Sequence, residues 1–164
     1  MKRSLFLSAI AAIGLSGCVA VVSSPTPTAS TTATTTVPSS ATAAENNAMA
    51  LINQNRSQSG LSALNIDGRL VRAAQLHAQD MNANGYFSHT GQNGSSVRTR
   101  VTAQGYSGCF WSENISSGRE TPSTAVEAWM NSDKHRANIL STSARQIGVG
   151  QSGPLWVAVF AAPC

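Results

Sequence analysis

The sequence predicts an α+β domain in which helices cover a small antiparallel sheet. Two segments with a helical period come first, a loop-rich middle holds one short strand, and two strand-like segments separated by a turn follow. Helices followed by a terminal hairpin favour this layered arrangement. With 164 residues, the chain allows one globular domain of ordinary size.

The first eighteen residues carry the pattern of an export signal. Lys2 and Arg3 give a positive start, and the apolar run 5–15 is too short to span a membrane but fits the core of a signal peptide. The segment ends in Leu-Ser-Gly-Cys18, which resembles the lipobox of bacterial lipoproteins. We therefore expect residues 1–17 to be removed and Cys18 to carry a lipid anchor in the membrane. An ordinary secreted protein with an incidental cysteine is the alternative.

A tether is predicted for residues 18–44, between the anchor and the domain. Residues 19–44 contain no charge, glycine or aromatic side chain, and sixteen of the twenty-six are Ser, Thr or Pro. Such a composition cannot build a core, so it predicts an extended spacer, with an adhesive or glycosylated segment as the alternative. The expected location is outside the cytoplasm. Val19 after the lipidated cysteine resembles the sorting pattern of outer-membrane lipoproteins, which implies that membrane where two membranes exist.

We expect the globular domain to span residues 45–164. The sequence of its first part predicts two helices. Between residues 45 and 58, apolar positions recur at helical spacing before Gly60. In the second helix Asp67 is the expected N-cap, residues 70–81 keep a 3.6-residue period, and Gly85 ends the helix.

The second part of the domain alternates loops with short elements. Thr121 followed by Pro122 is a helix start signal, and residues 151–154 predict a hairpin turn. The expected elements are a short helix at 96–102, a strand at 109–115, a helix from 122 through 130, a short helix at 135–140, and strands at 146–150 and 155–160.

The three cysteines have separate predicted fates. Lipidation consumes Cys18 and leaves Cys109 and Cys164 in an oxidising compartment, which suggests one disulfide. Closing that loop would stabilise the fold by about 4 kcal/mol in the chain-entropy model. A free C-terminal thiol and a metal-thiolate site are the alternatives.

The charge balance argues against a nucleic-acid partner. The formal net charge of the whole chain is +4, and two of its basic residues, Lys2 and Arg3, leave with the signal. The remaining nine basic and seven acidic residues nearly cancel. A domain so close to neutral lacks the basic surface that binds phosphates.

Three histidines and one acid stand out as chemistry-bearing residues. His77 lies on the apolar face of the second helix, where a core role with satisfied nitrogens is the simpler interpretation. His89 lies in a loop flanked by aromatic and turn residues, and His135 follows a polar turn. Glu113 lies mid-strand between Trp111 and Ile115, so its carboxylate needs an imidazolium, a metal or another partner.

These residues also carry a family resemblance. The order and spacing of the motifs resemble the CAP superfamily, which includes SCP-like bacterial proteins, cysteine-rich secretory proteins and plant pathogenesis-related proteins. The matching segments are Asn53 to Arg56, Leu70 to Met81, Tyr86 to Thr90, Glu113 to Ile115, Ala128 to Ser132, His135 to Leu140, and Gly148 to Gly150 before Trp156.

The resemblance implies an α-β-α sandwich with a cavity lined by histidines and acids. Carried over, the cavity residues are His89, His135 and Glu113, while Ser132 occupies the position of the family's second acid. Glu127 projects from another side of its helix and is expected to be a solvated charge. Ser112 replaces the glycine that commonly precedes the Glu-Asn pair.

Two imidazoles and one carboxylate would suit Zn²⁺ or another divalent cation, with an open position for water. The missing second acid removes the obvious general base, and Ser132 with His135 lacks a nucleophile elbow, so a ligand-binding module is favoured over an enzyme. Relatives that bind sterols or fatty acids make a lipid or a cell-envelope ligand the expected partner. The alternatives are a metal-dependent hydrolase of envelope peptide or glycan, and an adhesion or scaffold module.

Overall fold

A computed structural model describes residues 40–164 of the chain. The predicted signal peptide, Cys18 and the tether up to residue 39 lie outside the described residues. The elements are α1 (Ala43–Gln58), β1 (Asn65–Ile66), α2 (Gly68–Asn84), α3 (Val97–Ala103), β2 (Phe110–Ser116), α4 (Pro122–Met130), α5 (Asp133–Ile139), β3 (Gln146–Ser152) and β4 (Leu155–Ala162).

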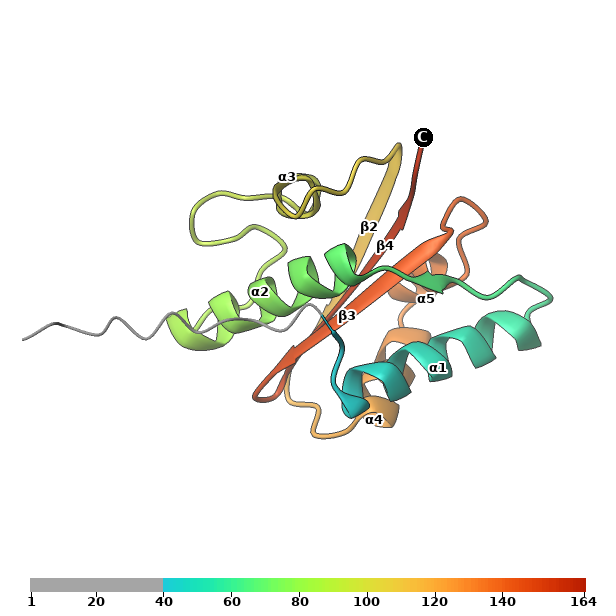
Figure 1. The fold of residues 1–164 in the computed structure, drawn as a ribbon. Coiled ribbons are helices and arrows are strands. Elements are labelled where there is room, and N and C mark those ends of the chain that lie inside the picture. The colour runs from blue at the N-terminus through green and yellow to red at the C-terminus, as the bar shows by residue number, and fades with distance from the viewer. Residues whose placement is uncertain (1–39) are drawn as a thin grey trace, which may run out of the picture. The chain divides into compact units, whose positions relative to one another are not determined.

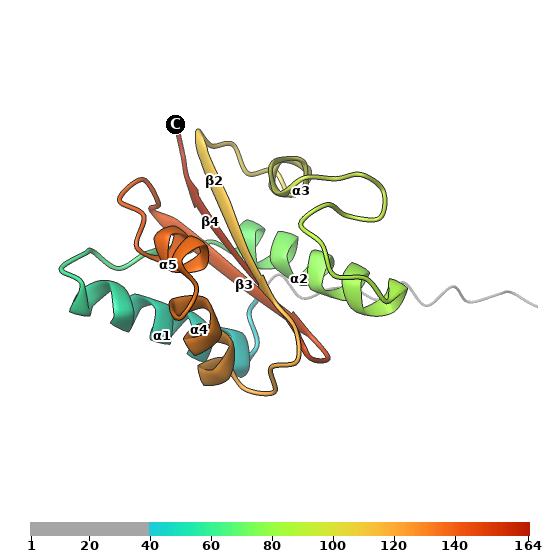
Figure 2. The same ribbon diagram turned by 180° about the vertical axis from the view of Figure 1, so that it is seen from behind.

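A four-stranded sheet, in the order β1-β3-β4-β2, separates two helical layers. Figures 1 and 2 show α1, α4 and α5 on one face and α2 with α3 on the other. The central strand β4 alternates between the two cores, as a strand buried on both faces must. Toward α1 and α4 it presents Trp156, Ala158 and Phe160. Toward α2 and α3 it presents Leu155, Val157, Val159 and Ala161. The expected α+β sandwich is confirmed.

Helix α2 rests directly on the backbone of β3, because β3 carries glycine where the helix crosses it. A Cβ atom on Gly148 would lie 2.1 Å from the backbone nitrogen of Val71. A Cβ atom on Gly150 would lie 2.2 Å from the backbone nitrogen of Gln75. The Gly-Val-Gly sequence therefore sets the distance between helix and sheet.

The helix boundaries follow local capping chemistry. Asp67 caps α2 through a side-chain bond to the Arg69 amide, and Gly85 ends the helix in the left-handed conformation with φ of 65°, as predicted. Thr121 and Pro122 start α4, also as predicted. The first helix begins at Ala43, two residues before the predicted domain boundary, because Thr42 forms a capping box with Glu45.

The sheet differs from the prediction at one edge. Strands β2, β3 and β4 are antiparallel, but the two-residue strand β1 pairs parallel with β3. A two-residue strand is too short to produce a period in the sequence. The turn between β3 and β4 is also shorter than predicted, because Gln151 and Ser152 pair with Trp156 and Leu155.

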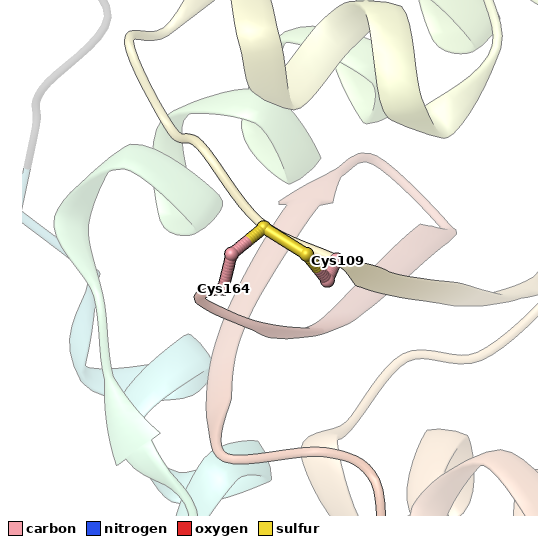
Figure 3. Close-up of a disulfide and its surroundings, with 2 residues drawn as sticks. All are labelled: Cys109 and Cys164. Carbon is pink, nitrogen blue, oxygen red and sulfur yellow. A yellow bond between two sulfur atoms is a disulfide. The ribbon is translucent and has the colours of Figure 1, made fainter.

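A disulfide between Cys109 and Cys164 is present, as predicted (Figure 3). Cys109 precedes β2 and Cys164 follows β4, and these neighbouring strands bring the two Cα atoms to 5.0 Å. The register continues to this point, since Phe110 lies opposite Ala162. The disulfide thus closes the end of the β2 and β4 pair.

Candidate functional site

Glu113 is the centre of the candidate site. Its side chain is only 3% exposed and receives bonds from two elements. His89 Nδ1 lies 2.9 Å from Oε1, and Arg100 donates to Oε2 at 2.7 Å. A strand, a helix and the loop between α2 and α3 (the α2–α3 loop, residues 85–96) therefore meet at one carboxylate.

The position of Glu113 follows from the pleat of β2. Consecutive side chains point to opposite faces of a strand, so Glu113 and Asn114 serve different layers. Glu113 lies opposite Val159 of the α2 and α3 core, and Asn114 lies opposite Ala158 of the α1 and α4 core. Because β2 is an edge strand, side chains from both layers can meet at its open edge.

Arg100 supplies the positive charge that the buried carboxylate requires. Its guanidinium also donates to the carbonyl oxygens of Ser95 at 2.8 Å and His89 at 3.1 Å. Removing one partner of such a pair costs about 3–5 kcal/mol, because the other charge stays buried alone. Arg100 therefore fixes both the carboxylate and the loop that carries His89. No sequence motif distinguished this arginine.

His89 is the exposed member of the site, with 58% of its side chain accessible. A carboxylate accepts hydrogen bonds only, so Nδ1 carries the proton that is shared with Glu113. The other nitrogen, Nε2, then has a free lone pair in the neutral ring. The imidazole is held from inside the protein with its acceptor nitrogen left for a ligand.

His77 is a third imidazole near the same carboxylate. It is 1% exposed, as expected of a core histidine, but its Nε2 lies 4.0 Å from Glu113 Oε1. Nε2 also lies 2.9 Å from the carbonyl oxygen of Ser88, a bond that requires the proton on Nε2. Nδ1 is buried without a partner among the described residues. Burial lowers the pKa of His77, so the ring is held neutral.

His135 lies on α5 and approaches the site from the other layer. Burial, and then the charge of His89, lower the pKa of His135, which puts the two rings within electrostatic range. The helix is fixed to β2 because Asn114 donates to the His135 carbonyl oxygen at 2.9 Å. Asn138 in turn donates to Asn114 Oδ1 at 2.8 Å.

We name the group formed by His89, Glu113, Arg100 and His135 the edge site. Ser132 is the N-cap residue of α5, and its side chain makes no cap hydrogen bond. Within residues 40–164, the Ser132 side chain forms no hydrogen bond to a residue of the edge site. Its assignment to the site therefore depends only on its sequence position, where the family has a second acid. Glu127 is exposed on α4, as expected of a solvated charge.

The predicted metal ligands can be compared with this geometry. Across residues 40–164, no three His, Cys, Asp or Glu side chains converge to hold a metal ion. Glu113 directs one oxygen to His89 and the other to Arg100. It therefore fits the role of a partner that orients His89, rather than that of a direct ligand.

Comparison with known proteins identifies relatives of the whole domain. The model of the cysteine-rich secretory protein family, CAP, matches residues 49–153. The uncharacterized protein YkwD of Bacillus subtilis (strain 168) is 39% identical over 132 residues, which are 79% of this chain and 51% of the relative. The uncharacterized membrane protein YlbC of the same organism is 32% identical over 109 residues, 66% of this chain and 32% of the relative. The chain thus spans about half or less of these curated relatives.

Solved structures agree on the fold. An extracellular protein with an SCP domain from Bacillus anthracis str. Ames has a TM-score of 0.70 at 27% identity, covering 72% of this chain and 40% of that one. An outer surface protein of Borrelia burgdorferi has a TM-score of 0.67 at 24% identity, covering 73% and 92%. Among residues 40–164, no helix is long and apolar enough to cross a membrane. The family match extends over most of the chain, which therefore belongs to the cysteine-rich secretory protein (CAP) family.

Proposed function

We propose that this CAP-domain protein is a lipid-anchored, extracytoplasmic module that binds a cell-envelope ligand at the edge site. The observation that carries the proposal is one exposed imidazole held by a buried charged network. His89 is 58% exposed, whereas the Glu113 and Arg100 side chains that hold it are 3% and 10% exposed.

The energetics of this network support binding over packing alone. Removing a carboxylate and a guanidinium from water costs several kcal/mol per ion before their attraction is counted. Here the buried pair fixes the His89 ring, which contributes little to the core because most of it is in solvent. A rigid acceptor nitrogen at the surface, within electrostatic range of His135, is what a ligand with hydroxyl or amide donors requires.

The proposal does not depend on a metal. A divalent cation at the edge site would be held by His89 Nε2 and His135, with Glu113 as the orienting partner. Two imidazoles are fewer than the three protein ligands that catalytic zinc sites use. The arrangement therefore does not fit the predicted three-ligand site, and we assign no reaction step to a cation.

Two observations support the location. The lipobox-like sequence ending at Cys18 follows a charged start and an apolar run, which is the pattern of an exported lipoprotein. The Bacillus anthracis relative is described as an extracellular protein. A tether rich in Ser, Thr and Pro after Cys18 would let the domain reach into the envelope from a membrane anchor.

Co-sedimentation with purified envelope fractions tests the proposed function. Every protein tested carries Cys18→Ala, so that no lipid anchor inserts into the vesicles, and is mixed without detergent, separately with glycan sacculi and with vesicles of extracted envelope lipid. We expect wild type and the exposed control Glu127→Ala to bind one fraction, and His89→Ala and His135→Ala to bind it at least tenfold more weakly. Equal binding by all four proteins, or binding by none, would contradict the proposal. Release of soluble fragments that requires His89 would instead identify a hydrolase.

A further inference from the structure

A cavity of about 630 Å³ lies between α2 and α3, and the proposed function does not use it. We name it the α2–α3 cavity. One side is formed by α2, and the other by α3 and the α2–α3 loop. Small-molecule sites have volumes of about 300–1,000 Å³, so the cavity can hold a small organic ligand.

Helix α3 and the loop before it are attached to α2 at two separate points, and the cavity lies between them. Arg69 donates to the Gly105 carbonyl oxygen at 3.3 Å, and the Gln92 backbone N–H donates to Asp80 Oδ2 at 3.3 Å. Arg69 and Asp80 are about three turns of α2 apart, which is about 16 Å. Between these points α3 buries only Val101, so the space beside α2 stays open.

Asp80 lies at one end of the α2 wall and is partly exposed. Its oxygens accept from the Tyr86 hydroxyl, from the Asn84 amide at 2.8 Å and from the Gln92 backbone at 3.3 Å. The hydrogen bond from Tyr86, ahead of the others, lowers the pKa of Asp80, so the carboxyl group is ionised at neutral pH. These donors are neutral, and no Lys, Arg or His of residues 40–164 forms an ion pair with Asp80. The carboxylate therefore keeps an unpaired negative charge.

The other titratable residues of the wall add no net charge to it. Arg100 donates to Glu113 Oε2 at 2.7 Å, so its positive charge is already paired. His77 is held neutral, because burial lowers its pKa. The wall of the α2–α3 cavity thus carries one net negative charge, which favours a cationic ligand over a neutral or anionic one.

The hydrogen-bonding capacity left on Asp80 favours an ammonium over a guanidinium. A carboxylate accepts about four hydrogen bonds, and Asp80 already accepts two on Oδ2 and one on Oδ1. A guanidinium binds best through two parallel bonds to both oxygens, whereas an ammonium is a point charge that needs only one. A further ammonium N–H can bind the side-chain oxygen of Gln92, which forms no hydrogen bond within residues 40–164.

The wall beside Asp80 is apolar. Leu76 lies one turn before Asp80 on α2, Ala73 lies one turn before Leu76, and Ala103 contributes from α3. Residues 73–80 extend about 10 Å along the helix, which is enough for a chain of several methylene groups. Each methylene group that is buried there would add about 0.8 kcal/mol to the binding.

We propose that the α2–α3 cavity binds a primary ammonium group on an aliphatic chain. The ammonium lies at Asp80, and the methylene groups lie along Leu76 and the two alanines. A lysine side chain and a free alkylamine share this chemistry. The cavity does not include His89 or His135, so the inference is independent of the proposed function.

Titration followed by NMR tests the proposal, using the isotope-labelled full chain with Cys18→Ala so that no detergent is needed. The two ammonium probes are n-butylamine and Nα-acetyl-lysine N-methylamide. We expect both to shift the side-chain ¹³C carboxylate resonance of Asp80 and the side-chain amide of Gln92 saturably, and less at high salt. The tighter binder of the two identifies the source as a free amine or a peptide.

Two control compounds test the chemistry of the ligand. The lysine probe acetylated on its side-chain nitrogen has lost the charge and should leave these resonances unchanged. The arginine analogue keeps the charge and should bind at least fivefold more weakly than the lysine probe. Equal binding of the acetylated and the charged lysine probes, or an arginine analogue that binds as tightly as lysine, would overturn the proposal.

Matched variants locate the site. Asp80→Asn should weaken binding of the ammonium probes at least tenfold, while Asp133→Asn, on the exposed side of α5, should bind as wild type does. Gln92→Lys keeps Asp80 but supplies a competing ammonium in the wall, so it should also weaken binding at least tenfold. Thr90→Lys adds the same charge to the same loop at an exposed position outside the wall, and should bind within about twofold of wild type.

His89→Ala should bind the ammonium probes as wild type does, whatever its effect on envelope binding. Urea unfolding shows whether each variant is folded. No saturable shift with either ammonium probe, or unchanged binding in Asp80→Asn or Gln92→Lys, would overturn the proposal. An equal loss in Thr90→Lys and Gln92→Lys would do so too, because it would show a general effect of charge.

Discussion

The side-chain amide of Asn138 donates to Asn114 Oδ1 at 2.8 Å, and so joins α5 to the edge strand β2. Asn114 is fully buried and passes the connection on by donating to the carbonyl oxygen of His135. Glu113, the preceding residue, binds His89 and Arg100 on one face of the sheet, while Asn114 fixes His135 on the other.

Replacing Asn138 by alanine should destabilise the domain by about 1–3 kcal/mol, because Asn114 Oδ1 would remain buried without a donor. Asn131→Ala, at an exposed position just before α5, should change the free energy of unfolding by less than about 0.5 kcal/mol. Urea unfolding of both variants checks this. Equal stability of the two variants would show that the amide pair contributes nothing.

Arg100→Met should cost about 3–5 kcal/mol, because Glu113 would keep a buried charge with no cation. Arg98, on the same helix, makes only a cation–π contact with Trp111 among residues 40–164, so Arg98→Met should cost about 0.5–1 kcal/mol. Adding Glu113→Gln to Arg100→Met should recover most of the loss. The measurement is again the free energy of unfolding, and a double variant no more stable than Arg100→Met would refute the ion-pair account.

Stability should fall as the pH drops below about 6.5, the value for a histidine in the unfolded chain. Burial lowers the pKa of His77 and His135 in the folded state, so protons bind the unfolded chain preferentially. Each such group contributes a slope of up to about 1.4 kcal/mol per pH unit. Asp67 and Asp80, whose lowered pKa values follow mainly from hydrogen bonds to Arg69 and Tyr86, act only below about pH 4.

Urea unfolding at several pH values between 4.5 and 7.5 measures this slope. His77→Gln should flatten it, and His135→Gln should flatten it less, because His135 is only half-buried. A wild-type slope that persists unchanged in both variants would mean that the histidines do not account for it.

Gly148→Ala should destabilise the fold by about 1–3 kcal/mol, because the new Cβ would lie 2.1 Å from the Val71 nitrogen and force α2 away from β3. Gly118→Ala separates this clash from backbone strain. Gly118 has φ of 70°, but beyond its chain neighbours no atom of residues 40–164 lies within 4 Å of the added Cβ. It should cost about 1 kcal/mol. Thermal unfolding ranks the two variants, and a larger loss in Gly118→Ala would argue against the close approach.

Cys18 should carry a diacylglycerol when the chain is produced in a bacterium. Mass spectrometry of the purified protein should show a chain that begins at Cys18 with lipid attached, and the protein should enter the detergent phase on phase separation. Cys18→Ala should remove the lipid mass. A cleaved, unmodified wild-type chain would favour simple secretion.

The helices and the main strands could be predicted because each has a local signal, and the disulfide because two cysteines remain once Cys18 is assigned to the lipid anchor. Asp67 and Gly85 bracket α2, and Thr121 with Pro122 starts α4. The parallel strand β1 could not be predicted, because two residues give no period and its partner is distant in the sequence. Its pairing depends on where β3 lies after folding.

The candidate site was predictable only in part. His89 and Glu113 were singled out by their surroundings in the sequence, and the structure places them 2.9 Å apart. Arg100 was not identified from the sequence, because no local pattern marks an arginine on a short helix as the partner of an acid thirteen residues away. His77 was correctly assigned to the core, but the expectation that both its nitrogens are satisfied was wrong, because among residues 40–164 only Nε2 has a partner. Its distance from Glu113 depends on how α2 packs on the sheet.

Because α2 lies directly on the glycines of β3, we expect it to open more slowly than α3 does. A helix lying on bare strand backbone cannot slide without opening a void, so its amides should be among the slowest to exchange with deuterium. Helix α3 is only seven residues long and has one buried residue, Val101, so it should open more readily. Local opening should therefore involve α3 before α2, which carries the buried His77.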